Sequence, residues 1–212
     1  MRALNLLRPM PIALAATLTF GCGLGEPPGG PSASGAPAQQ ESPLLVPPGH
    51  GTLLQDQISL QLQRGDLQIK VTPLEEWVIR LAAPDTYARL RGLAETHGAR
   101  AARSAMTTEP SLFLVSLFSR RPGITYEPED LLLVNRGLRL RPLGIAPITP
   151  SWGSQRLGQQ ETRMAIYAFQ GGIDLEADLE VEYQELRNEV WRERVFPLLQ
   201  AERARAIARA RR

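Results

Sequence analysis

The pattern of apolar and polar residues follows the period of β-strands over most of the chain between residues 53 and 190. Segments 58–63 and 67–71 each alternate apolar with polar residues, and Arg64-Gly65-Asp66 stands between them. Alternation with a period of two places one side of a strand against a core, and Gly with Asp favours a turn. We therefore predict a hairpin with one buried face, and we interpret Arg-Gly-Asp as its turn.

A helical pattern then interrupts the strands over about residues 73–104. The stretch TPLE at 72–75 fits a capping box with proline at the first helical position. Apolar residues over 74–81 are spaced three or four apart, which is the spacing of one helix face. Pro84 is expected to separate this helix from a second one that stops at Gly98.

Strand character returns after this insertion. Residues 111–119 are apolar on both faces, as expected of a strand at the centre of a sheet. Asn-Arg-Gly at 135–137 predicts a second hairpin. Gly171-Gly172 predicts a third, in which segment 161–170 pairs with 173–183.

The whole pattern predicts a fold that is mainly β with helices. The proline-rich stretch 142–153 is expected to be irregular or to lie at a sheet edge. About seven strand segments separated by turn residues are typical of an antiparallel β-sandwich. We expect this sandwich over residues 53–190, with a two-helix insertion, followed by a basic C-terminal helix or tail over 191–212.

The first 21 residues have the features of an export signal. Arg2 and Arg8 precede an uncharged apolar run over 9–20, and Gly21 is a small residue before the only cysteine, Cys22. The run is too short to span a bilayer as a helix, which needs about 20 residues. We therefore assign residues 1–21 to a signal peptide.

Gly21-Cys22 resembles the end of the lipobox of bacterial lipoproteins, although Thr19 and Phe20 stand where Leu and a small residue are usual. The resemblance implies cleavage before Cys22, a thioether-linked diacylglycerol on its sulfur and usually an acyl chain, such as palmitate, on its amine. Several acyl chains together give stable anchoring. It also implies a place in the cell envelope, at the periplasmic face of the outer membrane where two membranes exist.

Residues 23–52 have the composition of a flexible linker. They are rich in Pro, Gly, Ser and Ala and poor in aromatic residues. The alternative is that Leu44, Leu45 and Val46 dock on the folded domain. The domain itself, over about 53–185, resembles in its strand rhythm the immunoglobulin-like extracytoplasmic domains of bacterial lipoproteins, which implies an immunoglobulin-like sandwich.

The net charge is unevenly distributed. Without residues 1–21 the acidic and basic residues balance, but residues 192–212 hold seven arginines and two glutamates, while residues 22–191 carry −5. On an exported protein such a helix is expected to contact anionic headgroups or an acidic partner rather than nucleic acid; the alternative is a solvated tail. The arginines expected to make this contact are Arg203, Arg205, Arg209, Arg211 and Arg212.

Acidic residues recur at every second position of the last predicted strand. They are Asp174, Glu176, Asp178, Glu180 and Glu182. We interpret the row as a solvated face, with Arg139 and Arg141 as cross-strand partners. The alternative is a divalent-cation site that uses Asp174, Glu176 and Asp178.

No arrangement of residues predicts a catalytic site, a cofactor or a small-molecule substrate. The only histidines, His50 and His97, are distant in sequence, and the chain lacks a nucleophile elbow, a P-loop and a dinucleotide fingerprint. The sequence therefore favours a non-enzymatic lipoprotein that binds or positions a protein or envelope component. The alternative is a divalent-cation-binding module or metal-dependent hydrolase that uses the acidic strand.

Overall fold

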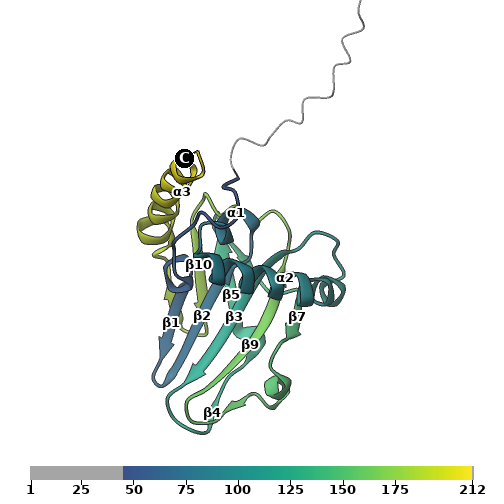
Figure 1. The fold of residues 1–212 in the computed structure, drawn as a ribbon. Coiled ribbons are helices and arrows are strands. Elements are labelled where there is room, and N and C mark those ends of the chain that lie inside the picture. The colour runs from purple at the N-terminus through teal and green to yellow at the C-terminus, as the bar shows by residue number, and fades with distance from the viewer. Residues whose placement is uncertain (1–44, 212) are drawn as a thin grey trace, which may run out of the picture. The chain divides into compact units, whose positions relative to one another are not determined.

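The computed structural model describes residues 45–211, and within this range the chain forms eleven strands and three α-helices (Figure 1). These residues belong to one compact unit. The expected signal peptide, Cys22 and the linker as far as Leu44 lie outside the described residues.

The strands form three antiparallel sheets. Their bounds are β1 (Leu60–Arg64), β2 (Leu67–Pro73), β3 (Ser111–Ser119), β4 (Ile124–Thr125), β5 (Leu131–Asn135), β6 (Leu138–Leu140), β7 (Gly144–Pro147), β8 (Arg156–Leu157), β9 (Glu161–Phe169), β10 (Leu179–Tyr183) and β11 (Leu186–Asn188). The strand orders are β1-β2-β3-β9-β7, β11-β10-β5-β6 and β4-β8. The predicted hairpins β1–β2 and β5–β6, the central position of β3 and the edge position of β7 are confirmed.

The helices are α1 (Glu76–Ile79), α2 (Pro84–Ala105) and α3 (Phe196–Ala210), with short helical turns at Gln55–Ile58, Pro128–Asp130, Pro150–Ser154 and Trp191–Val195. Figure 1 shows α2 lying across the five-stranded sheet. A Cβ on Gly144 of β7 would lie 2.6 Å from the backbone nitrogen of Ala105, so only glycine permits this close packing. The prediction that a fold rich in antiparallel strands also contains helices is confirmed.

The opposite face of the five-stranded sheet carries aromatic side chains. The rings of Phe113 and Phe169 lie edge to face with centroids 5.5 Å apart. The hydroxyl of Tyr167 donates to the carbonyl of Pro128, 2.9 Å away and shortly before β5. Buried side chains of both larger sheets belong to one hydrophobic core.

The predicted start of the first helix is wrong. Thr72 and Pro73 belong to β2, and the N–H of Leu74 donates to the carbonyl of Leu112, 2.9 Å away, which continues the sheet. The Thr72 hydroxyl lies 2.8 Å from the Ser59 hydroxyl and 2.9 Å from the Gln55 amide, so it caps no helix. The helical insertion therefore begins at Glu76 rather than at residue 73.

The predicted end of the second helix is also wrong. Gly98 is buried inside α2, which continues to Ala105 and ends where Met106 adopts a left-handed conformation. A Cβ on Gly98 would lie 2.9 Å from Cδ1 of Leu112. The glycine therefore allows the helix to approach β3, and packing rather than helix termination explains its position.

The third predicted hairpin, in which segment 161–170 pairs with 173–183, is wrong. β10 pairs with β5 and β11, not with β9, and it begins only at Leu179. The segment before it is a loop held by Asn135. The amide of Asn135 donates to the carbonyls of Asp174 and Asp178, both at 2.8 Å, and its oxygen accepts from the Asp174 N–H at 3.0 Å.

Residues 45–52, which composition assigned to the linker, contact the domain through the buried Val46 and Gly51. Val46 is 2 % exposed and its carbonyl accepts a hydrogen bond from Arg80, whereas Leu45 is exposed. The alternative of a docked segment is therefore correct for Val46; Leu44 lies outside the described residues. Pro197 lies in the first turn of α3, where its missing N–H is tolerated.

Candidate functional site at the junction of the N-terminal segment and the C-terminal helix

The helix α3 packs through one face. Leu199, Glu202 and Ala206 are buried, and their spacing of three and four residues places them on the same side of the helix. Two of these side chains are apolar, but the third is a carboxylate that is 1 % exposed. A buried charge is stable only with partners, so the surroundings of Glu202 decide how this helix is held.

Glu202 joins the first described segment of the chain to the last. Its Oε1 accepts hydrogen bonds from the N–H of Thr52 at 3.0 Å, from the Thr52 hydroxyl at 2.8 Å and from the guanidinium of Arg209. Arg209 also donates from Nε and Nη2 to the carbonyl of His50, at 3.0 and 2.6 Å. We call His50, Thr52, Glu202 and Arg209 the junction.

The segment that enters the junction is fixed on its other side to the connection between α1 and α2. A Cβ on Gly51 would lie 2.3 Å from the carbonyl carbon of Leu81. The N–H of Leu53 donates to the Leu81 carbonyl at 3.0 Å, and the N–H of Ala83 donates to the Leu53 carbonyl at 2.8 Å. The chain therefore enters the domain at a defined point beside α3.

The predicted contact arginines on α3 have different surroundings. Arg209 belongs to the junction, Arg203 is half-buried, and Arg205 and Arg211 are exposed. Arg212 lies outside the described residues. Figure 1 shows the end of α3 at the same end of the domain as α1 and the first described residues. Exposed cations thus lie near the point where the chain enters.

The predicted row of five carboxylates on one strand face is wrong, because Asp174, Glu176 and Asp178 lie in the loop before β10. The N–H of Glu176 donates to the Asp174 carboxylate at 2.8 Å, and Arg136 pairs with it. These two contacts, the first being the larger, hold the pKa of Asp174 below its usual range. Within residues 45–211 no group of three or more His, Cys, Asp or Glu is arranged to hold a metal ion.

The remaining two members of the row lie on β10 and form ion pairs. Glu180 pairs with Arg187, and Glu182 pairs with Arg139 at 3.0 Å and with Arg187 at 3.5 Å. Arg139 reaches Glu182 from β6 across the intervening β5. The cross-strand role predicted for Arg139 is therefore confirmed.

An open cavity of about 500 Å³ lies beside the loop before β10. Carboxylates and one aromatic side chain contribute to its walls: Glu75, Trp77, Glu109, Asp174 and Glu176. Burial raises the pKa of Glu75. This cavity is polar and acidic.

A second cavity of about 320 Å³ lies between β1 and the turn before α3. The residues that line it include Asp56, Gln61, Asn188 and Arg194.

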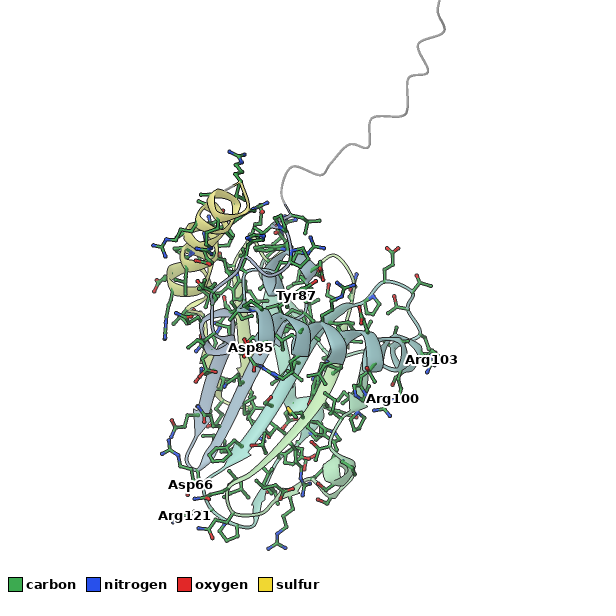
Figure 2. The ribbon with its side chains drawn as sticks, in the orientation of Figure 1. Asp66, Asp85, Tyr87, Arg100, Arg103 and Arg121 are labelled. Carbon is green, nitrogen blue, oxygen red and sulfur yellow. The ribbon has the colours of Figure 1, made fainter. Side chains whose placement is uncertain are left out.

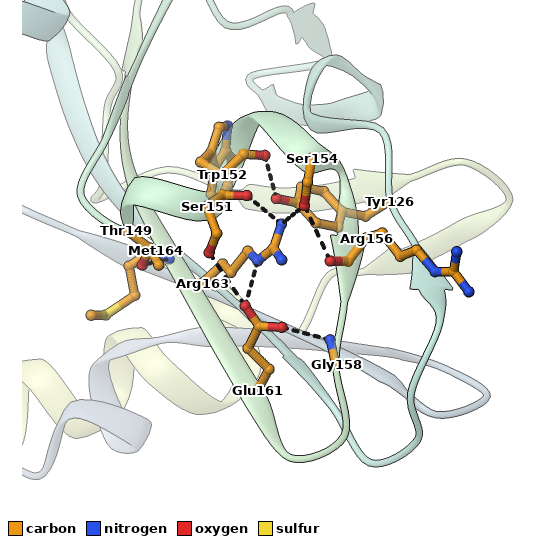
Figure 3. Close-up of polar contacts among 10 residues, drawn as sticks. All are labelled: Tyr126, Thr149, Ser151, Trp152, Ser154, Arg156, Gly158, Glu161, Arg163 and Met164. Carbon is orange, nitrogen blue, oxygen red and sulfur yellow. Dashed lines mark hydrogen bonds and ion pairs between the residues drawn. The ribbon is translucent and has the colours of Figure 1, made fainter.

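A partly buried ion pair between Arg163 and Glu161 at the start of β9 was not predicted from the sequence (Figure 3). Arg163 is 4 % exposed and donates to Glu161 at 2.7 Å, to the Ser151 carbonyl and to the Ser154 hydroxyl. Glu161 also accepts from the N–H of Gly158 at 2.6 Å. Arg163 lies two, four and six positions before the buried Ala165, Tyr167 and Phe169, so it is on the same side of β9 as they are. This spacing was the signal in the sequence that could have indicated its burial.

The polar groups of Arg163 and Glu161 form hydrogen bonds with each other and with the neighbouring loop. Within residues 45–211 no buried side-chain nitrogen or oxygen lacks a hydrogen-bond partner. The contacts tie the Pro150–Ser154 turn to β9, and the hydroxyl of Tyr126 donates to the Trp152 carbonyl at 2.8 Å in the same region. This cluster therefore stabilises a loop rather than presenting groups to a substrate.

The Arg-Gly-Asp stretch lies at the end of the strands opposite α1 and α3. Figure 2 places Asp66 and Arg121 there, and Arg121 pairs with Asp66 at 3.3 Å. The Asp66 carbonyl also accepts from the N–H of Arg120 at 3.1 Å. The prediction that this tripeptide forms a hairpin turn is confirmed.

No helix in the part of the chain that the structure describes is long and apolar enough to cross a membrane. Comparisons with protein-family models, curated proteins and solved structures give no match to this chain.

Proposed function

We propose that this protein is a lipid-anchored, non-enzymatic domain of the bacterial cell envelope, which binds or positions a protein or another envelope component. The signal sequence ending at Gly21 and the single thiol at Cys22 support the anchor. The periplasmic face of the outer membrane is the proposed location where two membranes exist.

The observation that carries this proposal is the junction. A tethered domain is positioned by its tether only if the chain enters at a fixed point, and Thr52 is held there by the buried Glu202. The sequence places 22 residues between Cys22 and the described chain. As a flexible coil they would span about 25 Å, which keeps the domain close to the bilayer.

The chemistry of the described residues supports a binding role. His50 lies in the N-terminal segment, where its carbonyl binds Arg209, while His97 lies on α2. Asp174, Glu176 and Asp178, which were considered for a cation site, lie before β10 and are not among any group of the described residues that is arranged to hold a metal ion. Arg163 and Glu161 are engaged with each other and with loop backbone.

We further infer that the two larger sheets form a β-sandwich. The shared core and the hydrogen bond from Tyr167 to Pro128 support this arrangement. The immunoglobulin-like character stays a prediction. It would be supported by an immunoglobulin-like protein of known structure whose two sheets have the same strand orders, β1-β2-β3-β9-β7 and β11-β10-β5-β6.

Substitution of the thiol tests the anchor. In cells expressing the full chain, Cys22→Ala is expected to release the protein from membranes that are washed at high salt, because no sulfur remains to carry diacylglycerol and salt screens any contact of the arginines with headgroups. Ser32→Ala, which changes the same Pro/Gly-rich region, is the matched control and is expected to stay with membranes. Membrane association of Cys22→Ala equal to that of the control would overturn the proposal.

A further inference from the structure

We propose that α3 docks the domain on an anionic phospholipid surface, with the exposed Arg205 and Arg211 as the groups that bind lipid phosphates. The inference deepens the proposed function, because the tether at Cys22 would bring this surface to the bilayer. It names the surface of the domain that faces the membrane and the chemistry that holds it there.

The exposed side of α3 is suited to a flat surface. Three small residues are exposed on this side of the helix: Ala201, Ala204 and Ala208. Small side chains let the helix backbone lie close to headgroups, within reach of long guanidinium side chains on either side. Arginine binds phosphate oxygens through paired N–H donors, so it suits this contact better than a point charge.

The charge distribution favours one orientation. Residues 192–212 carry +5 and residues 22–191 carry −5, so the chain that follows Gly21 has no net charge. The net charge of such a protein favours an approach to an anionic membrane through its basic end, because the remainder carries a net negative charge. Because screening limits these forces to about 8 Å at physiological salt, the exposed arginines must lie at the surface itself.

The position of the tether adds to this effect. Arg209 contacts the carbonyl of His50, so the chain enters the domain against α3, which carries Arg205 and is followed directly by Arg211. Tethering at this end raises the local concentration of the arginines at the headgroups. Attachment at the opposite end, near Asp66 and Arg121, would instead hold α3 away from the bilayer (Figure 2).

Vesicle binding tests the proposal without the anchor. Residues 22–212 carrying Cys22→Ser, and therefore no lipid, are sedimented with vesicles of equal parts phosphatidylglycerol and phosphatidylcholine, and with phosphatidylcholine alone. We expect binding to the anionic vesicles only, weakening as salt is raised. The double variant Arg205→Gln/Arg211→Gln should bind about thirty-fold more weakly, from about 1 kcal/mol for each arginine near the surface.

The matched control removes two exposed arginines elsewhere. Arg103→Gln/Arg141→Gln makes the same change in net charge at the end of α2 and beyond β6, where both side chains are exposed. It should change vesicle affinity less than about three-fold. Equal losses in the two double variants, or equal binding to neutral and anionic vesicles, would overturn the proposal.

Two outcomes separate this inference from its alternatives. Absence of vesicle binding, together with an envelope protein that co-purifies only when Arg205 and Arg211 are present, overturns the lipid assignment in favour of an acidic protein partner. Failure of the anchor at Cys22 is detected independently, because the vesicle assay uses protein without lipid. Unchanged thermal unfolding of both double variants shows that the fold is retained.

Discussion

Thr52 and Glu202 are 150 positions apart in the sequence, yet the N–H and the hydroxyl of Thr52 lie 3.0 and 2.8 Å from Oε1 of Glu202. This contact joins the segment that leads from the expected tether to the basic helix α3. Arg209 balances the charge of the carboxylate and holds the neighbouring His50 carbonyl. The segment by which the chain enters the domain is therefore joined directly to the basic helix by hydrogen bonds.

Replacing Thr52 with valine should weaken the junction. The variant keeps the shape of the side chain but removes the hydroxyl donor to a charged acceptor, so the free energy of unfolding should fall by about 1.5 kcal/mol. Urea unfolding followed by circular dichroism measures the change. Arg205→Gln, an exposed substitution on the same helix, should leave the midpoint within error. A Thr52→Val midpoint equal to that of the wild type would show that the contact contributes nothing.

Gly51 should tolerate no side chain, in contrast to Gly92. A Cβ at residue 51 would lie 2.3 to 2.5 Å from backbone atoms of Leu81 and Ala82, whereas a Cβ at residue 92 meets no atom within 4 Å. Gly51→Ala should therefore destabilise the domain by about 2 kcal/mol through overpacking. Gly92→Ala in α2 should stabilise it by about 0.5–1 kcal/mol. Thermal denaturation checks this: the melting temperature should fall for Gly51→Ala and rise for Gly92→Ala.

The parts of the fold that depend on local pattern were predictable from sequence. Alternation on both sides of Gly65 predicted the first hairpin, and the Asn-Arg-Gly turn at 135–137 predicted the second, because turn residues between strand segments are local signals. The apolar residues on both faces of β3 likewise predicted a central strand. Each of these features needs only neighbours in the sequence to be recognised.

The parts that depend on distant contacts were not predictable. Thr72 has the sequence context of a helix cap, but Ser59 and Gln55 bind its hydroxyl instead. The alternation over residues 173–183 predicted one long strand, but Asn135 holds Asp174 and Asp178 in a loop. The partners of these residues lie between 13 and 43 positions away, so no local pattern indicates them.

The role of Glu202 was hidden for the same reason. It occurs among arginines in a segment that was expected to contact an anionic surface or to be a solvated tail, and its burial depends on the distant Thr52 and on Arg209. Removing the segment after Gln200 to test partner binding would therefore also remove part of the core. Substitution of exposed arginines tests the charge without this effect.

Glu161 should make stability depend on acid pH. Its hydrogen bond from Arg163, followed by that from the Gly158 N–H, lowers its pKa in the folded state. A lowered pKa contributes stability that is present above the unfolded value, about 4.3, and is lost as the pH falls through the folded value. Glu161→Gln should flatten the fall in the free energy of unfolding below about pH 4.3. Urea titrations at a series of acid pH values that give identical slopes for both proteins would contradict this.

The central claim is that Cys22 is the attachment point, and the mass of the N-terminal peptide tests it most directly. Protein extracted from membranes with detergent and digested with protease is analysed by mass spectrometry. We predict a peptide that begins at Cys22 and carries a diacylglycerol on its sulfur and an acyl chain on its amine. A peptide that begins before Gly21, or one that contains Cys22 with a free thiol, would contradict the account.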